Sequence, residues 1–178
     1  MPFVTKRYIA DLHFGHALML TACKRPFAST QDMDEAMIRR WNDVVRPDDI
    51  TYIVGDFSMG LNDEERVRSI FSRLMGHKVL IIGNHDVRRE NQVHPTLARL
   101  DWMITPTPAM ETQDEGQRVY LSHYAHRTWP GSGKGSYHFY GHSHGELPHV
   151  GRSRDVGVDL PDVAFTPRTF KELTKGMK

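Results

Sequence analysis

The chain has 178 residues, of which 39% are hydrophobic and 25% charged, and its formal net charge at pH 7 is +1. These values are typical of one globular domain, residues 1–178, and exclude a disordered chain. A charge so close to zero gives no general attraction to nucleic acid or acidic membranes. The single cysteine, Cys23, excludes an internal disulfide, and no apolar run reaches the roughly 18 residues of a membrane span. The first residues also lack a secretory apolar run. We therefore expect a cytoplasmic protein with no membrane partner.

In the first half of the chain, short continuous apolar runs alternate with stretches in which apolar residues recur every three or four positions. The apolar runs predict strands over residues 3–10, 50–54 and 78–82. Apolar residues at spacings of three and four predict a helix over residues 32–46, which Pro47 ends. Asn62, with Glu65 three residues later, resembles a capping box that opens a second helix, and Gly76 is placed to stop it. This order is typical of a layered α/β fold.

The second half of the chain predicts mainly strands. Residues 88–100 are basic and polar, which indicates a loop with a short helix. The sequence "DEG" at 114–116 predicts a hairpin turn between strands. Further elements are expected as strands at 105–111, 117–123, 136–144 and 154–160 and as a terminal helix at 166–175.

Polar clusters follow the predicted strands one after another. They read "ADLH", "VGD", "GNHD", "LSHY" and "YGHSH". In layered α/β folds a ligand binds in the crevice beyond the carboxyl ends of the strands. We therefore expect these five clusters to converge on one site.

The side chains of these clusters form a candidate ligand set for metal ions. The candidates are Asp11, His13, Asp56, Asn84, His123, His142 and His144. Four imidazoles, two carboxylates and one amide oxygen are more than one ion needs, but they suit two divalent ions that share a bridging carboxylate. Mixed nitrogen and oxygen ligands favour Mn, our default, or Fe, Zn, Ni or Co, over Ca and Mg.

Two neighbouring residues of the "GNHD" cluster are left for catalysis. His85 is placed to face the substrate, where it would protonate the leaving alkoxide or stabilise the pentacoordinate phosphorus. Asp86 would orient His85, and the alternative is that its carboxylate only caps a turn.

The order of the motifs, D-x-H, G-D, G-N-H-D, a lone histidine and G-H-x-H, resembles the calcineurin-like metallophosphoesterase superfamily. The residues around these motifs ("ADLHFGH", "LSHYAHRTWPG", "FYGHSHG", "DVGVD") are similar to those of the small bacterial and phage predicted phosphoesterases. The resemblance covers residues 8 to about 159 and implies an α/β (α+β) fold. Its core would be two packed mixed β-sheets flanked by helices, a four-layer sandwich. Ala10 and Leu12 depart from the usual pattern, but neither side chain is expected to bind metal.

The resemblance also implies a role for each site residue. The first metal would take Asp11, His13 and His144, and the second would take Asn84, His123 and His142. Asp56 would bridge the two ions. His85 would be the catalytic histidine, with Asp86 as its partner.

The expected activity is that of a hydrolase acting on ester bonds, in which hydroxide activated by two metal ions attacks phosphorus. The substrate would be a phosphate mono- or diester, including a nucleotide or a nucleic-acid end. A small chain without a capping domain suggests an open site, which favours a phosphodiesterase. Candidate substrate contacts are His16, Arg88, His126 and Arg127, with Arg25 as a further pocket candidate. The alternative for His16 is a surface or cap residue, and for Arg88 a solvated loop charge.

Two other functions fit parts of the sequence. The sequence "GHSHG" matches G-x-S-x-G, but Pro148 and Gly151 prevent the helix that a nucleophile elbow at Ser143 needs. No downstream acid followed by a histidine completes a triad. A catalytically weak scaffold of the same fold is the second alternative, and the complete set of ligand positions argues against it.

Overall fold

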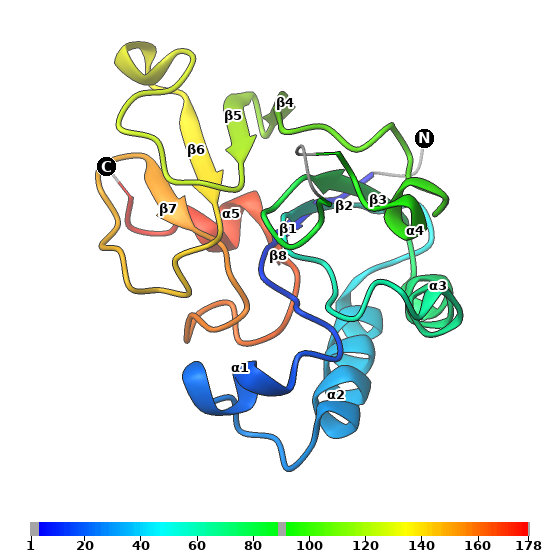
Figure 1. Ribbon diagram of the computed structural model, residues 1–178. Helices are drawn as coiled ribbons and strands as arrows, with labels where there is room; N and C mark the ends of the chain where they lie inside the picture. Colours follow the sequence, from blue (N-terminus) through cyan, green and yellow to red (C-terminus); the bar gives the residue numbers. More distant parts are fainter. Residues whose placement is uncertain (1–3, 89–91, 178) are drawn as a thin grey trace.

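Two four-stranded β-sheets form the centre of the computed structural model, which describes residues 4–88 and 92–177 (Figure 1). The first sheet has the order β3 (His77–Ile81), β2 (Ile50–Val54), β1 (Lys6–Ile9) and β8 (Arg168–Thr169). The second has the order β4 (Ala109–Asp114), β5 (Gln117–Ser122), β6 (Tyr137–Tyr140) and β7 (Ser153–Asp155). Each sheet contains parallel pairs and one antiparallel pair, so the predicted two mixed sheets are confirmed.

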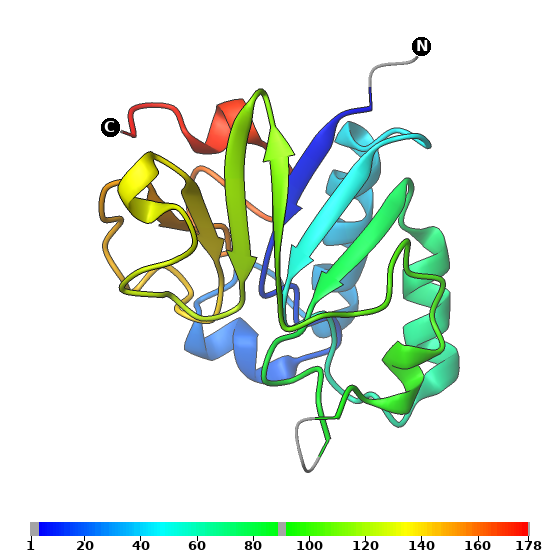
Figure 2. The ribbon, with the colours of Figure 1, turned by 90° about the horizontal axis from the view of Figure 1, so that it is seen from above.

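The described helices are α1 (Ala17–Ala22), α2 (Thr30–Val44), α3 (Glu64–Arg73), α4 (Pro95–Ala98), α5 (Phe170–Leu173) and the 3₁₀ helix η2 (Ser132–Lys134). Side-chain caps open four of the described helices, α2, α3, α4 and α5. The long helices α2 and α3 cover the outer face of the first sheet (Figure 2). The Ser29 side chain caps α2 by accepting from the Asp32 N–H at 3.0 Å, so this helix begins two residues earlier than predicted.

Several predicted elements need correction. The capping box of Asn62 and Glu65 is wrong, because Asp63 caps α3 and accepts from the Arg66 N–H at 3.1 Å. The predicted strand at 154–160 is reduced to β7, and the predicted terminal helix begins only at Phe170, since residues 168–169 pair with β1 as β8. Helix α1 was not predicted. Residue 3 of the first predicted strand and residues 89–91 of the predicted loop lie outside the described residues.

The predicted hairpin is confirmed. Strands β4 and β5 pair in antiparallel register from Ala109 opposite Ser122 to Asp114 opposite Gln117. The two turn residues, Glu115 and Gly116, have φ of 46° and 77°. Both residues of a type I′ turn need positive φ, and this turn matches the twist of the strands it joins.

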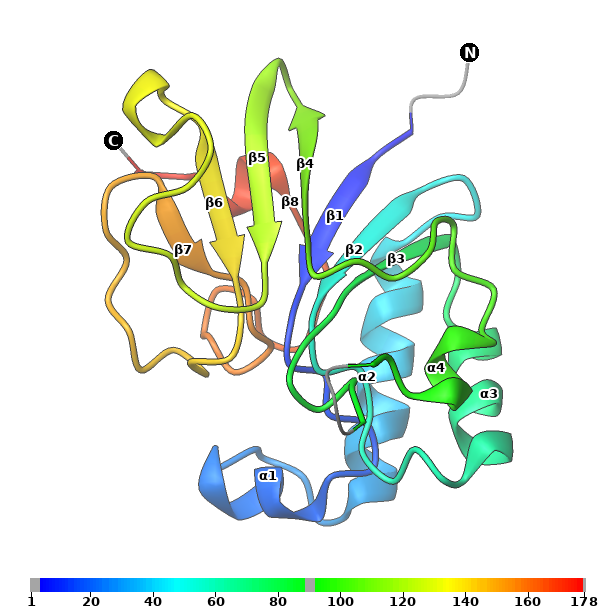
Figure 3. The same cartoon turned by 45° about the horizontal axis from the view of Figure 1, so that its top comes forward.

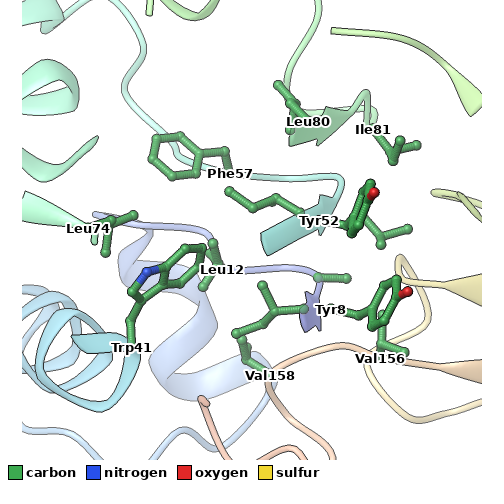
Figure 4. Packing of buried hydrophobic residues seen from close by; sticks show 14 of the residues in the cluster. Tyr8, Leu12, Trp41, Tyr52, Phe57, Leu74, Leu80, Ile81, Val156 and Val158 are labelled. Carbon is green, nitrogen blue, oxygen red and sulfur yellow. The ribbon is translucent and has the colours of Figure 1, made fainter. Parts of the chain in front are cut away.

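Aromatic and aliphatic side chains form the buried core, in which Tyr8 and Tyr52 lie side by side (Figure 4). The Tyr8 ring of β1 stacks on that of Tyr52 at 5.3 Å and meets the edge of Phe139, from the opposite sheet, at 5.0 Å. The buried Tyr8 hydroxyl donates to Asp114 Oδ2 at 2.8 Å, and burial raises its pKa. Trp41 packs α2 onto the first sheet and donates its Nε1–H to the Met75 carbonyl. This shared core fixes the two sheets relative to each other.

Within the described part of the chain, no helix has the length and apolar character needed to cross a membrane.

Candidate metal centre

The segments that carry the predicted ligands leave the carboxyl ends of β1, β2, β3, β5 and β6. Figure 3 shows the arrows of these strands running toward the same edge of the molecule. Strands β1, β2 and β3 are mutually parallel, as are β5 and β6, so their ends come together in space. The structure thereby brings the predicted ligands into two neighbouring groups.

The first group consists of Asp11, His13 and His144, with one potential ligand atom of each lying within 4.8 Å of the others. Asp11 Oδ2 and His13 Nε2 are buried and have no hydrogen-bond partner among the residues that the structure describes. Leaving buried polar atoms unpaired costs about 1–3 kcal/mol each unless a ligand satisfies them. A divalent cation suits both atoms, so this group fits a metal ion.

The second group consists of Asp56, His123 and His142, again with ligand atoms within 4.8 Å of one another. Asn84 joins it, because its Oδ1 lies 3.0 Å from His123 Nε2 and 2.9 Å from His142 Nδ1. The nitrogen and oxygen donors of this group also fit a first-row metal ion.

Asp56 lies between the two groups. Its Oδ2 is 3.5 Å from His13 Nε2 and 3.4 Å from His123 Nε2. Its Oδ1 accepts a hydrogen bond from the backbone N–H of His85 at 2.8 Å. Burial alone would raise the pKa of Asp56, but the hydrogen bond and charge of His123 outweigh it and hold the pKa at about 2. Asp56 is therefore an ionised carboxylate in the position that a bridging ligand needs.

The histidines of the two groups are held in defined orientations. His123 Nδ1 donates to the Val54 carbonyl at 2.9 Å, which leaves Nε2 to face Asp56. Burial would lower the pKa of His123, but Asp56 outweighs it and raises the pKa to about 9. Burial lowers the pKa of His13 to about 3, so its imidazole is neutral and keeps a lone pair for a ligand. Metal binding would displace the proton from His123.

The backbone of the ligand segments is strained. Five of the predicted ligands have φ between 47° and 65°, namely Asp11, His13, Asp56, His142 and His144. Such a conformation costs of order 1–3 kcal/mol at a non-glycine residue and persists where surrounding contacts enforce it. Gly55, at φ 92°, lies directly against the His123 ring, which a Cβ at this position would overlap. The strain is concentrated at the residues that carry the ligand atoms.

Asp86 holds the segment after β3. Its carboxylate is completely buried and accepts the N–H groups of Gly83 and Asp56 at 2.8 Å and of Phe57 at 2.9 Å. Within residues 4–88 and 92–177, no hydrogen bond joins this carboxylate to His85. These contacts are those of the alternative interpretation, in which the carboxylate caps a turn. The role of Asp86 as partner of His85 stays a prediction.

Asp155 holds the segment after β6 in the same way. It accepts from the Ser143 hydroxyl at 2.7 Å and from the N–H groups of Gly145 and Gly157 at 2.8 and 2.7 Å. The Ser143 hydroxyl thus supports the turn that presents His142 and His144. Sequence reasoning missed this role of Asp155, although "DVGVD" contains the residue.

A buried ion pair supports the first ligand group. Arg25 donates to both oxygens of Asp159, at 2.8 and 2.9 Å, and Asp159 Oδ2 accepts from His144 Nδ1 at 2.7 Å. Arg25 also donates to the carbonyls of Asp11 and Leu12 at 2.8 and 2.9 Å. The expectation that Arg25 lines a pocket is corrected, because the residue is only 3% exposed and is used by these contacts. Asp159 was not anticipated.

His85 and His16 lie beside the first group. The His85 ring centroid is 5.1 Å from that of His13 and 5.8 Å from that of His16. His16 precedes α1 as its N-cap residue, and its Nδ1 is 3.3 Å from His13 Nδ1. Burial lowers the pKa of His16. Both histidines are therefore placed where a substrate bound at this edge would meet them.

The other predicted substrate contacts lie farther out. His126 and Arg127 are exposed and line a cavity beside the ligand groups. Arg88 is exposed on the segment after Asp86, where its N–H donates to the Gln92 carbonyl at 2.7 Å.

A two-sheet α/β fold with two joined metal-ligand groups at its strand ends defines the class of this protein. Residues 8–127 match the family model described as calcineurin-like phosphoesterase. The chain therefore belongs to the calcineurin-like phosphoesterase family, whose members are metal-dependent phosphoesterases.

Individual relatives are more distant. An uncharacterised protein of Methanocaldococcus jannaschii is 41% identical over 78 residues, and the match covers 44% of each chain. The gene 66 protein of Mycobacterium phage L5 is 26% identical over a match that covers 85% of each chain. The crystal structure of a protein of unknown function from Aquifex aeolicus has a TM-score of 0.72 and 21% identity, covering 97% of this chain and 99% of that one. This last similarity concerns the fold.

Proposed function

We propose that the protein hydrolyses phosphate esters with two divalent metal ions, most readily manganese. The observation that carries the proposal is the position of Asp56, whose Oδ2 lies within 3.5 Å of His13 Nε2 in one ligand group and of His123 Nε2 in the other. A carboxylate shared by two groups of nitrogen and oxygen donors is the arrangement used by two-metal phosphoesterases.

The predicted ligands would be shared between the two ions. Asp11, His13 and His144 would hold one ion, and Asn84, His123 and His142 the other. The bound ions would supply Lewis acidity at the phosphoryl oxygens and lower the pKa of water. The fit rests on the unpaired buried atoms Asp11 Oδ2 and His13 Nε2 and on the mixed donor set.

His85 is proposed as the general acid. It is partly exposed, its ring is 5.1 Å from that of His13, and its backbone N–H donates to Asp56 Oδ1. From there it would donate a proton to the departing alcohol oxygen. His16, on the same side, would hydrogen-bond the phosphoryl group.

A diester is the favoured substrate, because the second ligand group is open. Asn84 and His142 of this group are exposed, although His123 is buried, whereas Asp11 and His13 of the first group are both buried. An open position beside the metals admits a phosphate that carries two substituents. A monoester would bind there as well, so the comparison of the two is the decisive assay.

The test is hydrolysis by the manganese-reconstituted protein of an aryl phosphomonoester, an aryl phosphodiester and a 2′,3′-cyclic nucleotide. We expect the diester to have the highest kcat/KM and chelation of the metal to abolish turnover. The alternative, a catalytically weak scaffold, predicts no metal-dependent hydrolysis of any of the three. That outcome would refute the proposed function.

A further inference from the structure

A large cavity lies beside the metal centre and has no role in the proposed chemistry. Its volume is about 990 Å³, and it is lined by Tyr140 of β6 and by residues of two segments, 125–135 and 147–153. These segments connect β5 to β6 and β6 to β7, and both leave the strand ends that carry the metal ligands (Figure 3). Ala125 comes two residues after His123, and Leu147 comes three residues after His144.

Tyr124 connects the cavity to the second ligand group. Its side chain is 50% exposed, and its ring centroid lies 5.3 Å from that of His123 and 4.6 Å from that of His142. The next residue along the chain, Ala125, already lines the cavity. The lining of the cavity therefore begins two residues after His123, a ligand of the second group.

The lining combines apolar surface with positive charge. Its apolar side chains include Trp129, Leu147, Pro148 and Val150, and its basic ones are His126, Arg127 and Arg152. Among the described residues that line the cavity, none is acidic. This combination is complementary to a ligand that is both flat and anionic.

Trp129 is fixed in place as part of this lining. Its Nε1–H donates to the carbonyl and the hydroxyl of Ser136 at 3.2 and 3.0 Å. A ring that is already held loses little further conformational freedom when a flat ligand stacks on it. Arg127, which is exposed beside it, is available to a phosphate.

We propose that the cavity binds a nucleotide unit of the substrate, with the base on Trp129 and the adjoining phosphate near Arg127. The inference rests on the proposed function, because it assigns the substituent of the phosphate ester cleaved at the metals. The unit comes from a free nucleotide or from a single-stranded nucleic acid, since both present a base and a phosphate.

The test is calorimetric binding to the full-length, manganese-loaded protein. The probes are thymidine 5′-monophosphate and 2-deoxyribose 5-phosphate, in which a hydroxyl replaces the base at C1′. We expect the nucleotide to bind at least about fivefold more tightly, the lower end of base–aromatic stacking. Trp129→Ala should remove this ratio, whereas Trp129→Phe, which keeps a ring, should retain most of it. Arg68→Gln, an exposed change on α3, is the control and should leave the ratio as in the parent.

Equal affinities for the two probes, or a ratio that persists in Trp129→Ala, would overturn the inference. A further titration with oligothymidylate distinguishes a free nucleotide from a single-stranded nucleic acid. A site for single strands predicts that the oligonucleotide binds more tightly, and with a stronger salt dependence, than the mononucleotide. A base-dependent ratio in a protein that hydrolyses no ester would refute the proposed function and leave the nucleotide site standing.

Discussion

Replacing Asp159 by Asn tests how far the metal centre depends on residues that do not touch the metals. The substitution keeps the size of the side chain but removes its charge. Arg25, which is almost fully buried, would lose the one carboxylate partner that it has among the described residues, while keeping the carbonyls of Asp11 and Leu12. His144 would lose the charged acceptor of its Nδ1–H, now 2.7 Å away.

The expected magnitudes follow from these contacts. Breaking a buried ion pair by removing one partner costs about 3–5 kcal/mol. We expect the lower end, about 3 kcal/mol in the free energy of unfolding, because the amide oxygen still accepts one hydrogen bond from Arg25. Removing the partner that orients a histidine ligand lowers metal affinity about 10- to 100-fold.

The assay is urea unfolding for stability and manganese calorimetry for affinity. Asp162→Asn is the matched control, because Asp162 also receives two hydrogen bonds from an arginine, Arg154, at 3.0 and 3.1 Å. Asp162 does not contact a metal-ligand candidate, so its loss should change stability but leave manganese affinity within about twofold. Manganese affinity of Asp159→Asn within the same twofold range would refute the reasoning.

Three further substitutions test other parts of the account. His85→Ala should retain manganese but lose about 10²–10⁴-fold in kcat on an aryl phosphodiester, as expected for a lost general acid; unchanged turnover would contradict the assignment. Asp56→Asn should lower occupancy at both metal positions, and two full equivalents by elemental analysis would contradict its bridging role. The third concerns stability against pH. Burial lowers the pKa of His138 to about 4 from an ordinary value of 6.5, so the unfolded chain binds more protons between these pH values. The free energy of unfolding therefore rises with pH across this window, by about 3 kcal/mol for this group. His138→Gln should remove this part of the rise in the free energy of unfolding with pH, measured by urea unfolding from pH 4.5 to 7. An unaltered pH dependence would contradict the assignment to His138.

The strand-end motifs could be predicted because their signals are local. Each buried strand is a short apolar run, and each ligand cluster follows within a few residues, as in "ITYIVGD" before Asp56. Parallel pairing brings the clusters of each sheet to one edge, and the packing of the two sheets on a shared core brings the two sets together. The hairpin at Glu115 and Gly116 is equally local, since two adjacent residues determine its turn.

The supports of the centre could not be predicted in the same way. Arg25 and Asp159 are 134 residues apart in the chain, and only the packed fold brings them together. Strand β8 has two residues, which is too short for a periodic signal, and it forms because β1 offers it an edge. The cap of α3 was misplaced by one position, because Asn62 and Asp63 are both good N-cap residues and the backbone selects the second.

The most direct test of the account is hydrolysis of bis(4-nitrophenyl) phosphate followed as manganese is added to the metal-free protein. We predict no turnover without metal and a rate that rises until two ions are bound per chain, as the two groups joined by Asp56 require. Full activity without metal, a maximum at one ion, or no activity with two ions bound would contradict the two-metal phosphoesterase.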